Sequence, residues 1–151
     1  MKKVLLMAVL MVGFAAVSTA QVDGKAIGLR LANGIEASYW HPMGDANRIE
    51  ADLGLNGWGG GLYAHGVYHW VKDLSSVTDG LNWYYGGGVG LGLFGGLSVG
   101  IVGQAGIEYN FKIKDLPLVA SLDYRPGLYF INPLPVWLSG SNACLSIRYK
   151  F

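Results

Sequence analysis

The chain has 151 residues with 11 basic and 10 acidic side chains, a near-balance that argues against nucleic acid as a partner, because nucleic acid is bound mainly through excess Lys and Arg. A single cysteine, Cys144, excludes an internal disulfide framework. Only 14% of the residues are charged and 52% are hydrophobic, whereas about 25% charged is usual for a soluble domain, so an ordinary soluble fold is disfavoured.

The first 20 residues have the form of a secretory signal peptide. Lys2 and Lys3 precede an apolar run over 4–17, and small residues at 18–20 precede a cleavage point. A membrane anchor is the alternative, but the apolar run is short and no stop-transfer sequence follows it. Cleavage would expose Gln21 rather than a cysteine, so no lipoprotein anchor is expected. We predict a signal peptide over 1–20 and one domain over 21–151.

Beyond the signal peptide, apolar residues alternate with polar or small ones. Over 25–40 the odd positions are mostly apolar and the even positions polar or small, a period of two that predicts a strand. The Asn33-Gly34 pair could form a hairpin turn. The roughly six residues on either side would then be too short to cross a membrane, which takes about 9 to 11 per strand. We therefore predict one strand over 25–40, with a bulge at this pair.

The same alternation recurs along the rest of the chain, in the segments 48–57, 62–72, 81–94, 97–111, 118–130 and 143–151. Residues 131–140 carry two prolines and do not alternate cleanly, so a strand there is the weakest element of the prediction. Short turns join the segments. The pattern predicts an all-β fold, a transmembrane antiparallel up-and-down β-barrel of eight strands.

The stretch GLGLFG over 90–95 matches the G-x-G-x-x-G pattern of a dinucleotide-binding loop. That site needs a helix opening at the third glycine and an acidic residue about 20 positions further on. Here a strand-like alternation follows, and Glu108 lies only 13 residues after Gly95. We interpret the stretch as the lower half of the 81–94 strand, one face of which is bare. We expect the glycines on that face to make room for long Arg and Glu side chains; they are Gly86, Gly88, Gly90 and Gly92.

The charged residues decide which face of the barrel points outward, because a soluble barrel with an apolar interior would alternate in the same way. All four arginines share the polar register with five carboxylates, whereas the lysines lie near strand ends, at Lys25, Lys72, Lys112, Lys114 and Lys150. A charge facing hydrocarbon costs about 2 to 4 kcal/mol, and Arg pairs well with carboxylates. We predict an apolar outer wall and a closed lumen with an ion-pair network of Arg30, Glu36, Arg48, Glu50, Asp52, Glu108, Asp123, Arg125 and Arg148.

Aromatic residues on the apolar register gather near strand ends. With the amino terminus at the periplasmic side, seven of them would lie at one level near the outer rim, as an aromatic girdle does at a membrane interface. Aromatic residues in a sandwich core would not be expected to cluster in this way. The predicted girdle is Tyr39, Tyr68, Trp70, Trp83, Tyr85, Tyr109 and Phe111, and Tyr149 and Phe151 would fall at the opposite rim.

Several pieces of the chain resemble a known group. SYWHP, NRIEADLGL, GIEYNF followed by LPLVASLDYRP, and the closing SIRYKF resemble small outer-membrane β-barrel proteins of Bacteroidetes-type bacteria and, more broadly, OmpA- and OmpX-type eight-stranded barrels. The likeness covers 25–151. It implies the outer membrane of a Gram-negative bacterium as the location, with outer-membrane lipid and the barrel-assembly machinery as partners. The terminal strand resembles the assembly signal, with Tyr149 and Phe151 in the key places.

The expected role is structural, in the envelope, for a monomer without enzymatic activity. No catalytic, cofactor-binding or metal-binding residues are predicted. His65 and His69 are four residues apart, about 13 Å on a strand and too far for one metal ion, so we interpret them as polar lumen residues.

Three other functions stay open at this point. The first is a surface module for adhesion or ligand docking, although the loops HPMGDAN, DLSSVTDG and IKD are short. The second is a lipid-modifying outer-membrane enzyme that would use His69 near the outer rim with Asp73, Ser75 or Ser76. The third is a soluble secreted barrel that binds a lipid.

Overall fold

The chain folds almost entirely into strands. The computed structural model describes residues 22–57, 60–93, 96–113, 115–131, 134–139 and 143–151. The predicted signal peptide and Lys114 lie outside these residues. Within them the strands are β1 (Ala26–Leu31), β2 (Gly34–Pro42), β3 (Asn47–Asn56), β4 (Leu62–Asp73), β5 (Leu81–Leu93), β6 (Leu97–Ile113), β7 (Leu116–Tyr124), β8 (Gly127–Ile131), β9 (Leu134–Ser139) and β10 (Ala143–Lys150). No helix in this part of the chain is long and apolar enough to cross a membrane.

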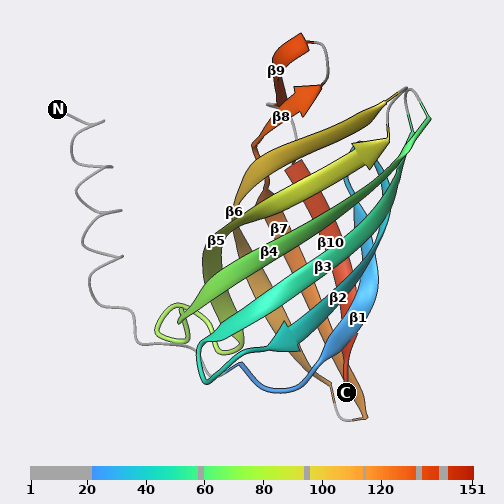
Figure 1. Ribbon diagram of the computed structural model, residues 1–151. Coiled ribbons are helices and arrows are strands. Elements are labelled where there is room, and N and C mark those ends of the chain that lie inside the picture. The colour runs from blue at the N-terminus through green and yellow to red at the C-terminus, as the bar shows by residue number, and fades with distance from the viewer. Residues whose placement is uncertain (1–21, 58–59, 94–95, 114, 132–133, 140–142) are drawn as a thin grey trace, which may run out of the picture.

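Eight of the strands close into an antiparallel barrel (Figure 1). Neighbours pair in the order β1, β2, β3, β4, β5, β6, β7 and β10, and β10 pairs with β1 to complete the ring. The β8–β9 hairpin pairs through β8 with the first part of β6, Ser98–Val102, and rises above one end of the barrel (Figure 1). The predicted closed eight-stranded antiparallel barrel is therefore confirmed.

The prediction of a single strand over 25–40 is wrong, because the chain reverses at Asn33 and Gly34. β1 and β2 form a hairpin in which Leu31 pairs with Ile35. The Ala32 amide donates to the Gly34 carbonyl at 3.0 Å and closes the turn. A side chain at Gly34 would collide with the backbone of the neighbouring strand, so the turn requires glycine there. The Asn-Gly pair therefore forms the hairpin turn that this dipeptide favours. The minimum strand length for crossing a membrane was the wrong criterion here.

The predicted strands over 131–140 and 143–151 are two parts of one return strand, β9 and β10. β7 and β8 likewise form one strand, interrupted at Arg125 and Pro126, where the Pro126 carbonyl accepts from the Gly103 amide at 2.9 Å. β8 pairs with β9 and β7 pairs with β10. Residues 132–133 and 140–142 of these predicted strands lie outside the described residues. The barrel still has eight strands. The predicted strand over 25–40 is divided into β1 and β2, whereas the predicted strands over 131–140 and 143–151 belong to one return strand.

Both ends of the described chain lie at the same end of the barrel. The Lys25 amide donates to Phe151 O at 3.1 Å, and the Phe151 amide donates to the Lys25 carbonyl at 2.8 Å. We call this the terminal end; it also holds the β2–β3, β4–β5 and β6–β7 connections (Figure 1). The opposite, distal end holds the β1–β2, β3–β4 and β5–β6 connections and the β8–β9 hairpin.

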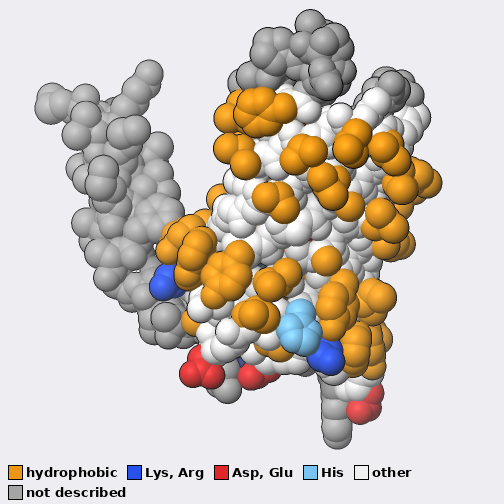
Figure 2. Space-filling model, viewed as in Figure 1, with side chains coloured by type: hydrophobic (Ala, Val, Ile, Leu, Met, Phe, Trp, Pro, Cys, Tyr) orange, Lys and Arg blue, Asp and Glu red, His pale blue; other side chains and the backbone are white. Residues whose placement is uncertain are grey.

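The outer wall is apolar and the interior is polar. Leu29, Leu122 and Ile147 point outward and are 56%, 53% and 52% exposed, whereas Arg30 and Arg148 point inward and are 0% and 1% exposed. In Figure 2 apolar side chains cover the visible wall, and the charged side chains gather toward the terminal end. This arrangement is the reverse of a soluble barrel, which buries its apolar residues.

The segment before β1 closes part of the mouth at the terminal end. Val22 packs against an inward-facing apolar pair, Val71 and Tyr84, and its amide donates to the Asp45 carbonyl at 2.6 Å. The lumen is therefore partly covered at this end by the chain itself.

Candidate functional site

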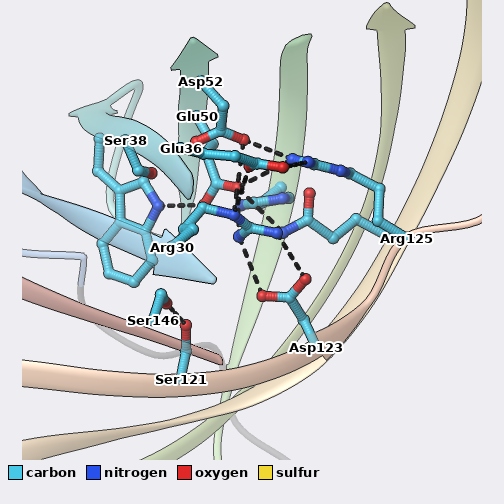
Figure 3. Close-up of polar contacts among 12 residues, drawn as sticks. Arg30, Glu36, Ser38, Glu50, Asp52, Ser121, Asp123, Arg125 and Ser146 are labelled. Atoms are coloured by element: carbon cyan, nitrogen blue, oxygen red, sulfur yellow. Dashed lines mark hydrogen bonds and ion pairs between the residues drawn. The ribbon is translucent and has the colours of Figure 1, made fainter. Parts of the chain in front are cut away.

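Arg30 lies at the centre of a buried ion-pair network in the lumen (Figure 3). Its guanidinium bonds to Glu36 at 3.0 Å, to Glu50 at 2.8 Å and, through two parallel hydrogen bonds of 2.8 and 3.0 Å, to Asp123. One cation thus connects β1 to β2, β3 and β7. Such charge-assisted, bidentate contacts are the strong members of their class and fix the geometry of the planar guanidinium.

Two further arginines complete the central group. Arg125, at the interruption between β7 and β8, bonds to Asp52 at 2.5 Å and to Glu36 at 2.6 Å. Arg148 on β10 bonds to Glu50 at 2.9 Å. Arg148 also donates to three hydroxyls, those of Ser38, Ser121 and Ser146, at distances from 2.6 to 3.0 Å. The hydroxyls satisfy guanidinium hydrogens that no carboxylate reaches.

Arg48 forms a second group nearer the terminal end. It pairs with Glu108 at 2.6 Å and donates through Nε to His69 Nδ1 at 3.3 Å. Its guanidinium carbon lies 3.4 Å from the centre of the Trp40 ring and 4.7 Å from that of Tyr84, in cation–π geometry. The arginine is thus held by one carboxylate and by two aromatic faces.

All nine residues of the predicted lumen network are at most 4% exposed. The four arginines and five carboxylates come from six strands and from the β7–β8 interruption, and the structure brings them into contact inside the barrel. With His69 on β4 and Tyr84 on β5, every strand of the closed barrel contributes a side chain to the network.

Sequence reasoning missed the uncharged members of the network. The Tyr84 hydroxyl donates to Asp123 at 2.8 Å, Gln104 donates to Glu50 at 3.0 Å, and the Trp40 indole nitrogen donates to Glu50. The signal was present, because all three share the register of the arginines. Trp40 is the instructive case: it lies on the polar face although it is aromatic, and both Arg48 and Arg148 stack on it.

The expectation that the bare face of β5 makes room for Arg and Glu is wrong. A Cβ at Gly90 would lie 2.8 Å from the His65 ring and 2.9 Å from the Tyr129 hydroxyl, and one at Gly86 would lie 2.8 Å from the His69 ring. Gly90 therefore accommodates two rings, whereas Gly86 and Gly88 accommodate the backbone carbonyl oxygens of Tyr68 and Gly66, each close enough to collide with an added Cβ. The reason is position, because β5 faces the histidines of its neighbour β4 across the ladder.

Other glycines accept the charged chains. Gly28 on β1 faces Arg148, and a Cβ there would lie 2.8 Å from the Arg148 Cγ. Gly106 on β6 faces Asp123, and a Cβ there would collide with the Asp123 Cβ. Part of the room for the network therefore comes from Gly28 on β1 and Gly106 on β6.

The predicted girdle residues lie together, but at the terminal end. Ile27 on β1 pairs with Tyr39 on one side and with Tyr149 on the other, so both tyrosines lie at one end. The expectation that Tyr149 and Phe151 fall at the opposite rim is wrong, because the extra reversal at the β1–β2 turn changes the direction of every strand from β2 to β9 and leaves that of β10 as predicted. Neighbouring rings contact one another, as Trp70 does with Tyr85 at 5.5 Å between ring centres. We keep the name girdle for Tyr39, Tyr68, Trp70, Trp83, Tyr85, Tyr109 and Phe111.

The two lumen histidines lie apart and have different partners. His65 Nε2 and the Tyr129 hydroxyl are 2.5 Å apart, whereas His69 is fully buried and packs on Tyr84. Ser75 donates to Asp73 at 2.7 Å in the exposed β4–β5 turn. This turn and His69 lie toward the terminal end rather than at a rim remote from the termini. Among the residues that the structure describes, no group of three or more His, Cys, Asp or Glu side chains is placed to hold a metal ion.

The lumen near the terminal end contains little free space. A cavity of about 20 Å³ lies between the segment over 22–24 and the side chains of Trp40, Arg48, Asn82 and Glu108. This volume is enough for about one water molecule. The described part of the site can hold charges in place and exclude solvent, which are structural properties.

Comparison with protein-family models, with curated proteins and with solved structures found no match for this chain. The resemblance to small outer-membrane barrels therefore stays a prediction.

Proposed function

We propose that this chain is an integral outer-membrane β-barrel with a structural role in the envelope. The observation that carries the proposal is the inverted distribution of polarity, with large apolar residues on the outside and paired charges on the inside. Soluble monomers rarely expose continuous apolar patches of more than a few hundred Å². Here apolar side chains cover the wall, and hydrocarbon is the solvent that such a surface fits.

The closed barrel satisfies the main requirement of a spanning structure. Within hydrocarbon, backbone N–H and C=O groups need internal partners, which only helices and closed barrels provide. The ring from β1 to β10 supplies these partners for the strands that it contains. Aromatic residues at the terminal end fit the position of an interfacial girdle.

The lumen supports a structural role better than a transport role. Its four arginines bond to carboxylates from several strands, so the interior is a dense polar plug. A water-filled channel would need these side chains to lie along the wall. The proposal includes no catalytic step, cofactor or metal ion, and a monomer in outer-membrane lipid is its simplest form. The barrel-assembly machinery is the proposed partner during biogenesis, through the terminal Tyr149 and Phe151.

The test combines fractionation with gel mobility. The full chain, expressed with its own amino-terminal segment in a Gram-negative host, should pellet with outer membranes and resist carbonate extraction. The folded form should migrate faster on a gel than the boiled form. A chain that stays freely water-soluble as a monomer would overturn the proposal. A steady open conductance in planar bilayers would overturn the closed lumen and leave the membrane location intact.

A further inference from the structure

The barrel wall has different heights on its two sides. Along β2, four residues separate Tyr39 of the girdle from Ile35 beside the distal turn, whereas along β5 eight residues separate Tyr85 from Leu93. With about 3.3 Å per residue and a strand tilt of about 40°, the corresponding heights along the barrel axis are about 10 Å and about 20 Å. β1 has about the same height as β2, because Ile27 pairs with Tyr39 and Leu31 pairs with Ile35. We call β1 and β2 the low wall.

The barrel cannot be shifted to compensate for the low wall, because its two ends have different chemistry. The terminal end holds exposed charged residues, namely Lys25, Asp45, Asp79, Lys112 and Asp115. The segments 31–35, 53–71, 80–107 and 126–147, which include every distal connection, contain no Asp, Glu, Lys or Arg. The residues beside the distal turns are aliphatic and outward, and Leu31, Ile35 and Leu55 are 55%, 60% and 64% exposed. The terminal end is therefore suited to contact with water, and the distal rim is suited to contact with lipid.

A low wall of this height is too short for an undisturbed bilayer. The apolar band of an outer-membrane barrel is about 25 Å tall. If the girdle lies at the interface, the Asn33-Gly34 turn lies about halfway across. Polar backbone groups at that depth are unfavourable, whereas a bilayer can become thinner beside a short hydrophobic surface at a modest cost per Å. Thinning of the bilayer relieves the mismatch without burying the Asn33-Gly34 turn in hydrocarbon.

We propose that the low wall thins the bilayer locally. Lipids of the leaflet opposite the termini move down toward the Asn33-Gly34 turn, and their acyl chains pack against Leu31 and Ile35. Beside β5 and β6 the bilayer keeps its ordinary thickness. The inference rests on the proposed membrane location and assigns to the low wall a specific partner, the acyl chains of the distal leaflet.

The test compares two outward residues at the same height above the girdle. Ile35 on the low wall and Val89 on β5 each lie four residues from a girdle tyrosine, and they are 60% and 57% exposed. Each is replaced by cysteine in a Cys144→Ser background, labelled with an NBD fluorophore and refolded into dioleoyl phosphatidylcholine vesicles. Nitroxide on the lipid headgroup or deep in the acyl chain, and aqueous iodide, then report the depth of each label. Faster gel migration of the unboiled sample verifies folding.

The expected result is that headgroup nitroxide quenches the Ile35 label at least about twofold more than the Val89 label, which only the deep nitroxide reaches. Equal, deep quenching of both labels would overturn local thinning while leaving the membrane location intact. Strong iodide quenching of both labels with no lipid quenching would overturn the membrane location and the thinning with it.

A longer hairpin gives an independent arm. Insertion of two apolar–polar pairs into β1 and two into β2, next to the turn, keeps the alternation and raises the low wall by about 10 Å. The label at Ile35 should then become as deep as the label at Val89. If the difference between the two labels persists in the longer hairpin, the height of the wall is not its cause and the inference fails.

Discussion

In the half of the lumen nearer the termini, charged side chains from the surrounding strands fill the space, whereas in the distal half the rings of Tyr63, His65 and Tyr129 pack beside bare glycine backbone. The first half is stabilised by pairing, because each cation there contacts a carboxylate. The second half depends on shape, because its rings fit only where a Cβ is missing. A narrow barrel can thus exclude solvent by pairing charges or by close packing of rings. The first is lost when a partner charge is removed, and the second when a side chain is added at a glycine.

The largest effect should come from Arg30→Ala in the charged half. The change removes a cation that contacts Glu36, Glu50 and Asp123 and leaves these carboxylates buried without it. Breaking a buried pair typically costs about 3 to 5 kcal/mol. Urea unfolding in lipid vesicles, followed by tryptophan fluorescence, measures the loss. A loss below about 1 kcal/mol would mean that water reaches the network.

A smaller effect should follow from Gly90→Val in the distal half. The new side chain would overlap the ring of His65 and the hydroxyl of Tyr129, at 2.8 and 2.9 Å from its Cβ. Overpacking of this kind costs about 1 to 3 kcal/mol. Gly87→Val is the matched control on the same strand, because a Cβ at this outward position meets only the Val102 carbonyl oxygen, at 3.6 Å. Equal unfolding midpoints for the two variants would contradict the close fit.

Tyr129→Phe should have a still smaller effect. It keeps the ring and removes the hydroxyl that lies 2.5 Å from His65 Nε2. The expected loss in the free energy of unfolding is about 1 kcal/mol. Tyr85→Phe serves as the control, since this outward ring is 39% exposed. If both variants unfold at the same urea concentration, the hydrogen bond contributes nothing measurable.

The smallest effect should come from Lys112→Ala. Lys112 pairs with Asp79 at 2.5 Å, but the two side chains are 68% and 74% exposed. Exposed pairs contribute between about 0 and 1 kcal/mol. The unfolding free energy should therefore stay within about 1 kcal/mol of the unmodified chain, and added salt should remove any difference. A loss as large as that of Arg30→Ala would show that charge itself, rather than burial, sets the ranking.

The alternation of the sequence determined which residues face inward, but it could not determine strand direction. Leu31 and Ile35 are partners across the β1–β2 turn and both occupy odd positions, so the apolar register passes through the reversal without a change of phase. A period of two is the same for one long strand and for a hairpin of this kind. The end of the barrel at which the girdle lies depended on that reversal, and it was therefore predicted wrongly.

The charged part of the site was predictable from types and register, because an arginine on the polar face of a narrow barrel has few partners other than carboxylates. The contacts of Trp40 and Gly90 were not predictable in the same way. Trp40 faces inward and stacks against the guanidinium groups of Arg48 and Arg148. Position 90 is glycine because the Tyr129 ring lies too close to where a Cβ would be. Both depend on which strands become neighbours after closure, and alternation does not specify this.

The pairing of β1 with β10 has a consequence for biogenesis. The first and last strands of the barrel form its seam, from Ala26 with Lys150 to Leu31 with Leu145. A nascent chain that lacks β10 therefore has two unpaired strand edges, β1 and β7, which are templates for aggregation. Contacts of such large sequence separation also form slowly. Closure must therefore wait for β10, and a chain from which β10 is deleted should yield material for degradation instead of a smaller barrel.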